Sequence, residues 1–218
     1  MQWTAEPGIE LTTGAAVVVR AYIESYYLAF LTADKKYLYP GFDESVDRDH
    51  GESSETRALW PQSRSPVTWI GTARHHLLRI VEAGHDVTVL GCAYVYGTAR
   101  PEDSSFKANG AGAGPNAGIN PLRIVLRSPE TGEPTLPPQQ GTSRAARQDV
   151  FGGWRVISHE GGYFATGPWG PGSAETAECV SRADGRPESR DFKPWEGYPA
   201  SDFPTLPATP GWPDVPTS

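Results

Sequence analysis

The chain has 218 residues and a net charge of −7, and its 19 lysines and arginines are scattered. This distribution excludes the positive surface with which proteins bind nucleic acid. The 24 glycines and 21 prolines are too many for one compact domain, whereas a hydrophobic content of 38% is enough for a globular core. We therefore expect a folded body with long loops and an irregular tail.

Residues 13–36 predict a long amphipathic helix that ends near Ala33. Thr12 or Thr13 is placed to cap its N-terminus. Residues 1–12 are expected to be an extension in front of the helix. Apolar side chains recur at the spacing of one helix face, at Ala16, Val19, Ile23, Tyr26, Tyr27, Phe30 and Leu31.

An acidic, polar segment follows at residues 43–66 and predicts a long loop. Its carboxylates at Asp43, Glu44, Asp47 and Asp49 are oxygen ligands of the kind that calcium prefers. Their spacing does not match a calcium-binding loop with alternating ligands and a central glycine. A solvated loop is therefore the better interpretation, and we expect no metal site and no cofactor.

Residues 67–99 predict a β-hairpin with Gly84 at its bend. In its second arm, alternate side chains point to opposite faces of a sheet. One set is Thr88, Leu90, Cys92, Tyr94 and Tyr96, and the other is Val87, Val89, Ala93 and Val95. Both sets are mostly apolar, which indicates a strand that is covered on both faces.

Two further strands are predicted at residues 122–127 and 154–158, with a break or bulge at Gly152 and Gly153. Residues 101–118 are rich in small residues and predict a flexible linker without a phosphate-binding motif. The connections show no helical pattern, so we expect a curved, mostly antiparallel sheet of about four to six strands.

The two cysteines, Cys92 and Cys179, are too few for a four-ligand zinc site and form no C-x-x-C motif. A disulfide between them would tie the tail to the sheet and constrain the unfolded chain. The alternative is one buried and one exposed free thiol. The sequence favours the disulfide.

Residues 166–218 are rich in proline and show no helix or strand period, so they predict an irregular tail. The aromatic side chains of this tail are more numerous than a solvated linker needs, which indicates that part of it packs on the body. Residues 205–218 are expected to be disordered.

The helix, short turn, polar loop and antiparallel strands ending in GGWRVISHEG resemble the cone-shaped, cystatin-like α+β fold of nuclear transport factor two, SnoaL-like proteins and ketosteroid isomerase. The nearest similarity is to actinobacterial envelope lipoprotein domains with A-x-x-F-V-x-Y-Y followed by A-x-x-T-G-D-x-x-x-L. The positions that match this pattern are Ala21, Tyr22, Tyr26, Tyr27, Ala29, Thr32, Ala33, Asp34 and Leu38.

This chain lacks the close cysteine pair that often follows the motif in that group, and Ala33 stands in place of its glycine. The resemblance implies a domain at residues 13–165. It also implies a place outside the cytoplasm, secreted or lipid-anchored, with any leader or lipid-attachment segment not part of this chain.

A cone of this kind encloses a pocket on the concave face of its sheet, here expected to be lined by Tyr22, Tyr26, Tyr94 and Tyr96. Enzymes of the fold use an Asp or His in this pocket as a general base. The candidates here are His76 and Asp149. His75 and His76 are neighbours on a strand and point to opposite faces, so only one of them can face the pocket. Strand histidines are more often structural, and the sequence favours a noncatalytic role.

We therefore expect a noncatalytic binding or interaction domain of the cell envelope or a secreted one. Its expected partners are a small apolar ligand or a protein, including a second copy in a homodimer, with no nucleic acid and no transmembrane segment in this chain. One alternative is an acid–base isomerase or cyclase of the SnoaL or ketosteroid isomerase kind. Another is a structural part of a phage or conjugation apparatus whose tail reaches a neighbouring subunit.

Overall fold

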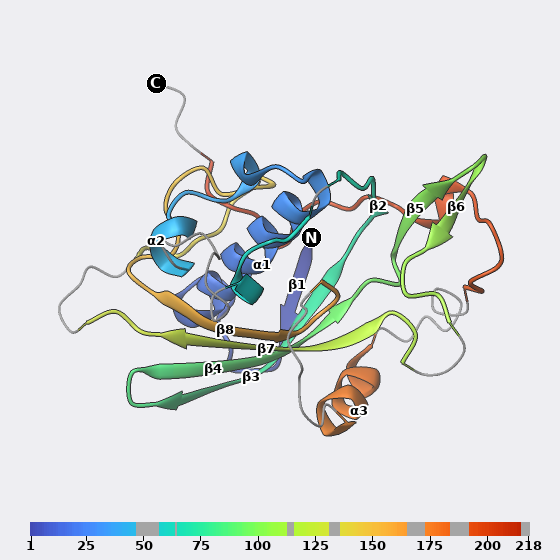
Figure 1. Ribbon diagram of the computed structural model, residues 1–218. Coiled ribbons are helices and arrows are strands. Elements are labelled where there is room, and N and C mark those ends of the chain that lie inside the picture. The colour runs from blue at the N-terminus through green and yellow to red at the C-terminus, as the bar shows by residue number, and fades with distance from the viewer. Residues whose placement is uncertain are drawn as a thin grey trace.

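A long helix lies across one face of a five-stranded sheet, and a smaller three-stranded sheet extends from one end (Figure 1). The fold is α+β with mostly antiparallel strands, as the sequence predicts, and the sheet system is open. The computed structural model describes residues 1–46, 57–63, 65–112, 116–130, 136–164, 173–183 and 192–214.

The main sheet has the strand order β1-β3-β4-β7-β8. Its strands are β1 (Gln2–Ala5), β3 (Arg74–Ala83), β4 (Asp86–Tyr94), β7 (Ile119–Arg127) and β8 (Arg155–Gly161). All neighbours are antiparallel except β1, which runs parallel to β3. Strands β3 and β4 form the predicted hairpin. Gly152 and Gly153 form a turn before β8, and the irregular pairing lies inside β8, opposite Val125 and Leu126.

The expectation that residues 1–12 are only an extension is wrong, because β1 belongs to this sheet. Four residues are too few to show a strand period. The indole of Trp3 is 2% exposed and stacks on the His75 ring at 4.4 Å between centroids. The partners that hold β1 in place are therefore distant in the sequence.

The smaller sheet consists of β2 (Ile70–Gly71), β5 (Thr98–Glu102) and β6 (Ser105–Ala108), in that order. The sequence predicts a flexible linker at residues 101–118. This prediction is wrong for residues 101–108, which contain the end of β5 and all of β6. The apolar face of this sheet packs against Phe192 and Phe203, which come from the far end of the chain. The sequence around residues 98–108 does not reveal this packing, because the partners lie about ninety residues further along the chain.

Helix α1 (Gly14–Thr32) ends where the sequence predicts, since Ala33 adopts the left-handed conformation of a C-cap with φ 52°. Thr13 occupies the N-cap position, but its side chain makes no capping hydrogen bond. By length and composition α1 is also a candidate membrane span. However, 78% of its most apolar window is buried in the fold, as in the core helix of a globular domain.

Short helical segments follow α1. They are η1 (Lys35–Tyr37), α2 (Phe42–Val46) and η2 (Arg57–Leu59), with η4 (Ala200–Asp202) near the C-terminus. Helix α2 corrects the prediction that the loop begins at residue 43, because Phe42 and Val46 are buried and anchor a helical turn. Asp47 and Asp49 lie outside the described residues.

The two faces of the main sheet carry separate apolar clusters, as the alternation in β4 predicts. Val87 and Val89 pack in the cluster that contains α1. Cys92 and Tyr94 belong to the cluster on the opposite face, beneath helix α3 (Ser173–Arg182). Figure 1 shows α1 and α3 on opposite sides of the sheet.

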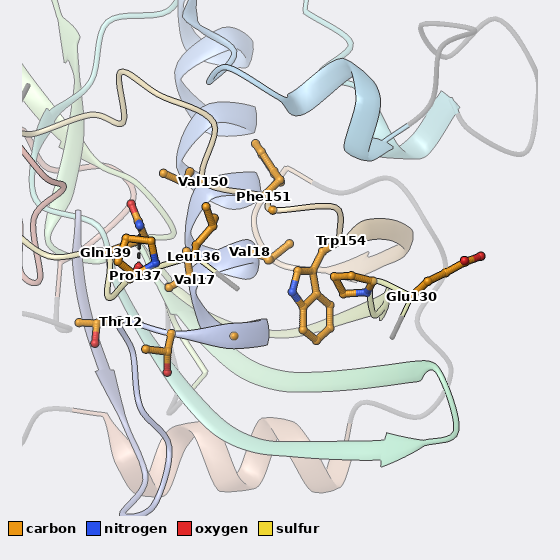
Figure 2. A pocket seen from close by; sticks show the side chains of 14 residues that line it. Thr12, Val17, Val18, Glu130, Leu136, Pro137, Gln139, Val150, Phe151 and Trp154 are labelled. Atoms are coloured by element: carbon orange, nitrogen blue, oxygen red, sulfur yellow. Dashed lines mark hydrogen bonds between the residues drawn. The ribbon is translucent and has the colours of Figure 1, made fainter. Parts of the chain in front are cut away.

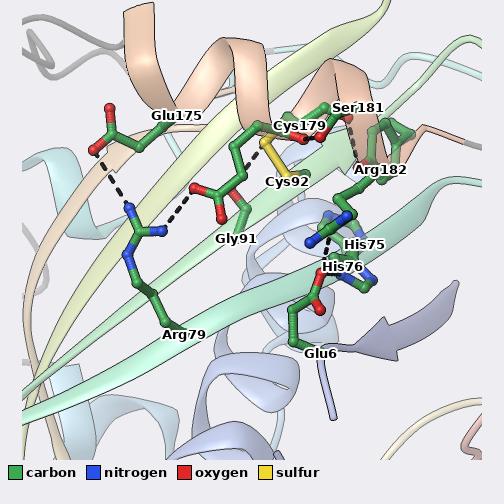
Figure 3. Close-up of a disulfide and its surroundings, with 12 residues drawn as sticks. Glu6, His75, His76, Arg79, Gly91, Cys92, Glu175, Cys179, Ser181 and Arg182 are labelled. Atoms are coloured by element: carbon green, nitrogen blue, oxygen red, sulfur yellow. Dashed lines mark hydrogen bonds and ion pairs between the residues drawn. A yellow bond between two sulfur atoms is a disulfide. The ribbon is translucent and has the colours of Figure 1, made fainter.

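Helix α3 contradicts the prediction that the tail has no helical segment. The stretch SAETAECVSR contains neither proline nor glycine, although prolines crowd the rest of the tail. A disulfide between Cys92 and Cys179 joins α3 to β4, and both cysteines are fully buried. Arg79 of β3 also pairs with Glu178 of α3 at 2.6 Å (Figure 3). The disulfide and the ion pair thus stabilise a ten-residue helix that would be only marginally stable in isolation.

A buried polar junction holds both ends of the chain on α1. The Glu24 carboxylate accepts hydrogen bonds from Trp3 Nε1 at 2.7 Å, Tyr39 Oη at 2.9 Å and Trp212 Nε1 at 2.6 Å. Arg20, one helical turn earlier, is also fully buried. We call these five residues the Glu24 junction.

The junction corrects the expectation of disorder for residues 205–214, whereas residues 215–218 lie outside the described residues. The C-terminal segment, residues 204–214, runs from the small sheet back over α1 (Figure 1). Within this segment, the Trp212 side chain is completely buried. Its partners lie at the other end of the sequence, so proline content alone gave a misleading prediction here.

Replacing Glu24 with Ala should strongly destabilise the fold. The change leaves three buried donors without their acceptor and Arg20 without a nearby opposite charge, a loss of about 3 to 5 kcal/mol. Urea unfolding measures it. The control is Glu160→Ala, which removes a carboxylate paired with Arg123 at the surface and should cost at most about 1 kcal/mol. Equal losses for the two variants would contradict the structural role of the junction.

Replacing Cys92 and Cys179 together with Ala should lower the free energy of unfolding by about 4 to 5 kcal/mol, because the disulfide closes a long loop in the unfolded chain. Urea unfolding of the oxidised protein and of the double variant measures the difference. Identical midpoints would show that α3 is held without the bond.

Candidate functional site

A cavity of about 520 Å³ lies beside the first turn of α1 (Figure 2). Its walls come from the N-terminus of α1, the loop after β7 and the turn before β8. The residues that line it are Thr12, Thr13, Gly14, Val17, Val18, Pro129, Glu130, Leu136, Pro137, Gln139, Val150, Phe151, Gly152 and Trp154.

The turn before β8 shapes one wall. Asp149 Oδ1 accepts a hydrogen bond from the Phe151 amide at 2.8 Å, which fixes the start of the turn. Gly152 has a φ of 57°, and a Cβ atom there would lie 2.9 Å from Leu136 across the cavity edge. The left-handed backbone conformation therefore favours glycine here, and a larger residue would also displace the Leu136 side chain.

The opposite wall is fastened next to the start of α1 by one main-chain hydrogen bond, and a side-chain hydrogen bond braces the wall internally. The Gln139 amide donates to the Thr12 carbonyl at 2.7 Å. The Gln139 side chain donates to the Pro137 carbonyl at 2.7 Å. These bonds hold residues 136–139 against the start of the helix.

The lining is mainly apolar, with valine, leucine, proline, phenylalanine and tryptophan side chains. Among the described residues of the lining, Glu130 is the one ionisable residue, and its side chain points away from the cavity (Figure 2). The first backbone N–H groups of a helix have no partner within the helix. Thr13 and Gly14 therefore provide a polar end, and the arrangement suits a small apolar molecule better than acid–base chemistry.

The structure does not bring the four predicted pocket tyrosines together. Tyr22 and Tyr26 lie between α1 and the sheet, where Tyr22 Oη donates to the Leu59 carbonyl at 3.0 Å. Burial raises the pKa of Tyr26 to about 12. Tyr94 and Tyr96 lie on the opposite face, beside a depression of about 70 Å³. The main sheet lies between the two pairs, because Tyr22 and Tyr26 belong to the α1 cluster and Tyr94 and Tyr96 to the cluster on the other face.

His76 lies on the outer face of the sheet. Its Nδ1 is 2.8 Å from Thr4 Oγ1 and its Nε2 is 3.2 Å from Glu6 Oε1 (Figure 3). Glu6 also accepts a hydrogen bond from Arg182 of α3. His76 thus connects β1, β3 and α3 at a distance from the cavity. Asp149 is exposed at the turn before β8 and does not line the cavity.

Two other histidines are buried on the inner face of the sheet. Both ring nitrogens of His75 lack a hydrogen-bond partner in the described chain, as does His159 Nε2. His159 Nδ1 lies 3.0 Å from Tyr22 Oη. Burial lowers the pKa of each histidine to about 3, with a further contribution to His75 from the N-terminal ammonium. Both rings are therefore neutral near pH 7.

Sequence reasoning missed the residues that form the cavity. Val17 and Val18 are adjacent on α1, and the predicted apolar stripe does not include them. The stretch VFGGW at residues 150–154 carried the available signal, since a glycine pair between two aromatic residues places both rings at one turn. Among the described residues, no group of three or more His, Cys, Asp or Glu could hold a metal ion.

Comparison of the chain with protein-family models, curated proteins and solved structures gave no match. The functional proposal therefore depends on the geometry of the cavity.

Because His75 and His159 are buried and neutral, we expect the free energy of unfolding to decrease as the pH is lowered from about 7 to about 5. Most carboxyl groups titrate below this range. The unfolded chain binds protons near the usual histidine pKa of about 6.5, whereas the folded chain does not bind them until about 3. Stability is complete above the unfolded value and is lost as pH falls towards the folded value. Urea unfolding at about pH 7 and about pH 5 should differ by on the order of 2 kcal/mol for each histidine.

The variant His75→Phe should lose about half of this pH dependence, because phenylalanine keeps the stacking on Trp3 without a titrating ring. His85→Gln, which removes an exposed imidazole, is the matched control. An unfolding free energy that is the same at both pH values would contradict the neutral, buried state of the two rings.

Proposed function

We propose that this protein is a noncatalytic binding domain that takes up a small, mostly apolar ligand in the cavity beside the first turn of α1. The observation that supports this proposal is the cavity itself, with a volume of about 520 Å³ and a mainly apolar lining. Small-molecule sites typically have volumes of roughly 300 to 1,000 Å³ and combine apolar walls with a few polar groups.

The walls and the polar end give the ligand two expected properties. An apolar group would pack on Val17, Phe151 and Trp154, and each buried methylene would contribute about 0.8 kcal/mol. One hydrogen-bond acceptor on the ligand would face the first backbone N–H groups of α1, which have no partner within the helix. Such a ligand is bound by burial and a single polar contact.

The site differs from the concave sheet face suggested by the sequence. The aromatic side chains of α1 fill that face, and Tyr22, Ile23 and Tyr27 are at most 1% exposed. A binding cavity at the end of the helix, rather than beneath it, is therefore the version of the proposal that the packing supports. Residues 192–214 pack on their own chain in the described structure, which lends no support to a tail that reaches a neighbour.

We also propose that the protein works outside the cytoplasm, secreted or lipid-anchored. The disulfide between Cys92 and Cys179 supports this location, because structural disulfides persist in oxidising compartments. The acid–base enzyme alternative receives less support, since neither His76 nor Asp149 lines the cavity.

The neutral fluorescent probe N-phenyl-1-naphthylamine tests the site. It should bind with a rise in its emission, and energy transfer should occur from Trp154, which lines the cavity. The variant Leu136→Trp should weaken binding by roughly tenfold or more, because the larger ring occupies the cavity from a position that is 38% exposed.

The matched control is Val81→Trp, which adds the same ring to the outer sheet face at a position that is 51% exposed. It should leave the affinity unchanged. Equal loss in both variants, or no binding to the wild-type protein, would contradict the proposed site.

A further inference from the structure

Arg20 lies where the wall of the cavity meets the C-terminal segment. Its Nη1 donates to the carbonyls of Leu11 at 2.8 Å and Gln139 at 3.3 Å. Its Nη2 donates to the carbonyls of Pro210 at 2.8 Å and Gly211 at 3.3 Å. One buried guanidinium thus joins two parts of the fold, the cavity wall at Leu11 and Gln139 and the C-terminal segment at Pro210 and Gly211.

The two parts have different roles. Leu11 and Gln139 adjoin the hydrogen bond from the Gln139 amide to the Thr12 carbonyl, which closes the cavity wall. Pro210 and Gly211 belong to the C-terminal segment, whose Trp212 ring lies 4.4 Å from the Arg20 guanidinium carbon. Trp212 also donates to Glu24, so the seating of this segment is linked to the whole Glu24 junction.

We propose that the C-terminal segment controls the cavity through Arg20. When the segment is seated, the guanidinium is held in the orientation that secures the cavity wall, and when the segment leaves, the wall loosens and ligand affinity falls. Coupling between two sites is reciprocal, so a ligand in the cavity strengthens the seating of the segment by the same factor. This effect on ligand affinity rests on the proposed function.

The planarity of the guanidinium is the physical reason for the coupling. Arginine presents its donors in a rigid fork, so Nη1 and Nη2 cannot reorient independently. Loss of the Pro210 and Gly211 carbonyls would leave the Nη2 hydrogens without acceptors in a fully buried site. Rotation of the group towards new acceptors or water would withdraw Nη1 from Leu11 and Gln139.

Amide hydrogen exchange of Trp212→Phe tests the coupling. Phenylalanine keeps an aromatic ring under Arg20 but removes the indole donor to Glu24. We expect exchange to become roughly tenfold faster at residue 212, whose amide bonds to Ser143, and also at the Gln139 amide.

Thr142→Ala is the matched control. It removes the hydrogen bonds from Thr142 to Asp214 in the same segment, at 3.1 and 2.9 Å, without touching Arg20. It should leave exchange at Gln139 unchanged. Faster exchange at residue 212 of Trp212→Phe with unchanged exchange at Gln139 would overturn the proposal.

The wild-type protein provides a second test that needs no variant to fold. In urea below the unfolding transition, the Gln139 and Trp212 amides should open with one free energy and one urea dependence, as members of a single opening unit. Separate dependences would overturn the coupling.

Binding of N-phenyl-1-naphthylamine separates this proposal from the proposed function. Saturating probe should slow exchange at Trp212, and Trp212→Phe should bind the probe roughly tenfold more weakly. Probe binding that is equal in both proteins would overturn the control of affinity. If no probe binds while Gln139 responds to Trp212→Phe, the proposed function fails and the mechanical coupling stands.

Discussion

The buried carboxylate of Glu24 is the interaction on which the arrangement of this chain depends. It accepts hydrogen bonds from the N-terminal strand, from the loop after α1 and from the C-terminal segment, so three distant parts of the sequence meet at one helix position. A buried charge is tolerable only when it is paired and hydrogen-bonded. Arg20 and the three donors meet that condition, and as a result α1 is covered on the side that faces away from the sheet.

This covering of α1 explains where the structure leaves a cavity. The space between α1 and the sheet is filled by aromatic rings, among them Tyr22, whose ring stacks on Phe42 at 5.6 Å between centroids. The outer face of the sheet carries α3, fixed by the disulfide. The larger cavity opens instead at the first turn of α1, where the helix is not enclosed by the sheet. The junction that closes the helix therefore also positions the wall of the proposed binding site.

The sequence was sufficient for features that depend on local pattern and failed for those that depend on distant partners. The span of α1, the hairpin bend at Gly84 and the two faces of β4 were visible in the local sequence. The prediction that only one face of α1 is apolar and buried was wrong, because the helix is buried on all sides from Ala15 to Tyr27. Strand β1 and the small sheet were missed because their packing partners come from the other end of the chain. The predicted tyrosine pocket combined residues from both faces of the sheet, and the cavity residues lie outside the apolar stripe.

We propose above all that the cavity beside the first turn of α1 binds a small apolar molecule. Amide shifts in proton–nitrogen NMR spectra, recorded as N-phenyl-1-naphthylamine is added, test it most directly. The account predicts that the largest shifts gather at Gly14, Val17, Gln139, Gly152 and the Trp154 indole, which surround the cavity. Shifts centred on the outer sheet face around Val81, or on the exposed Trp195, would contradict it.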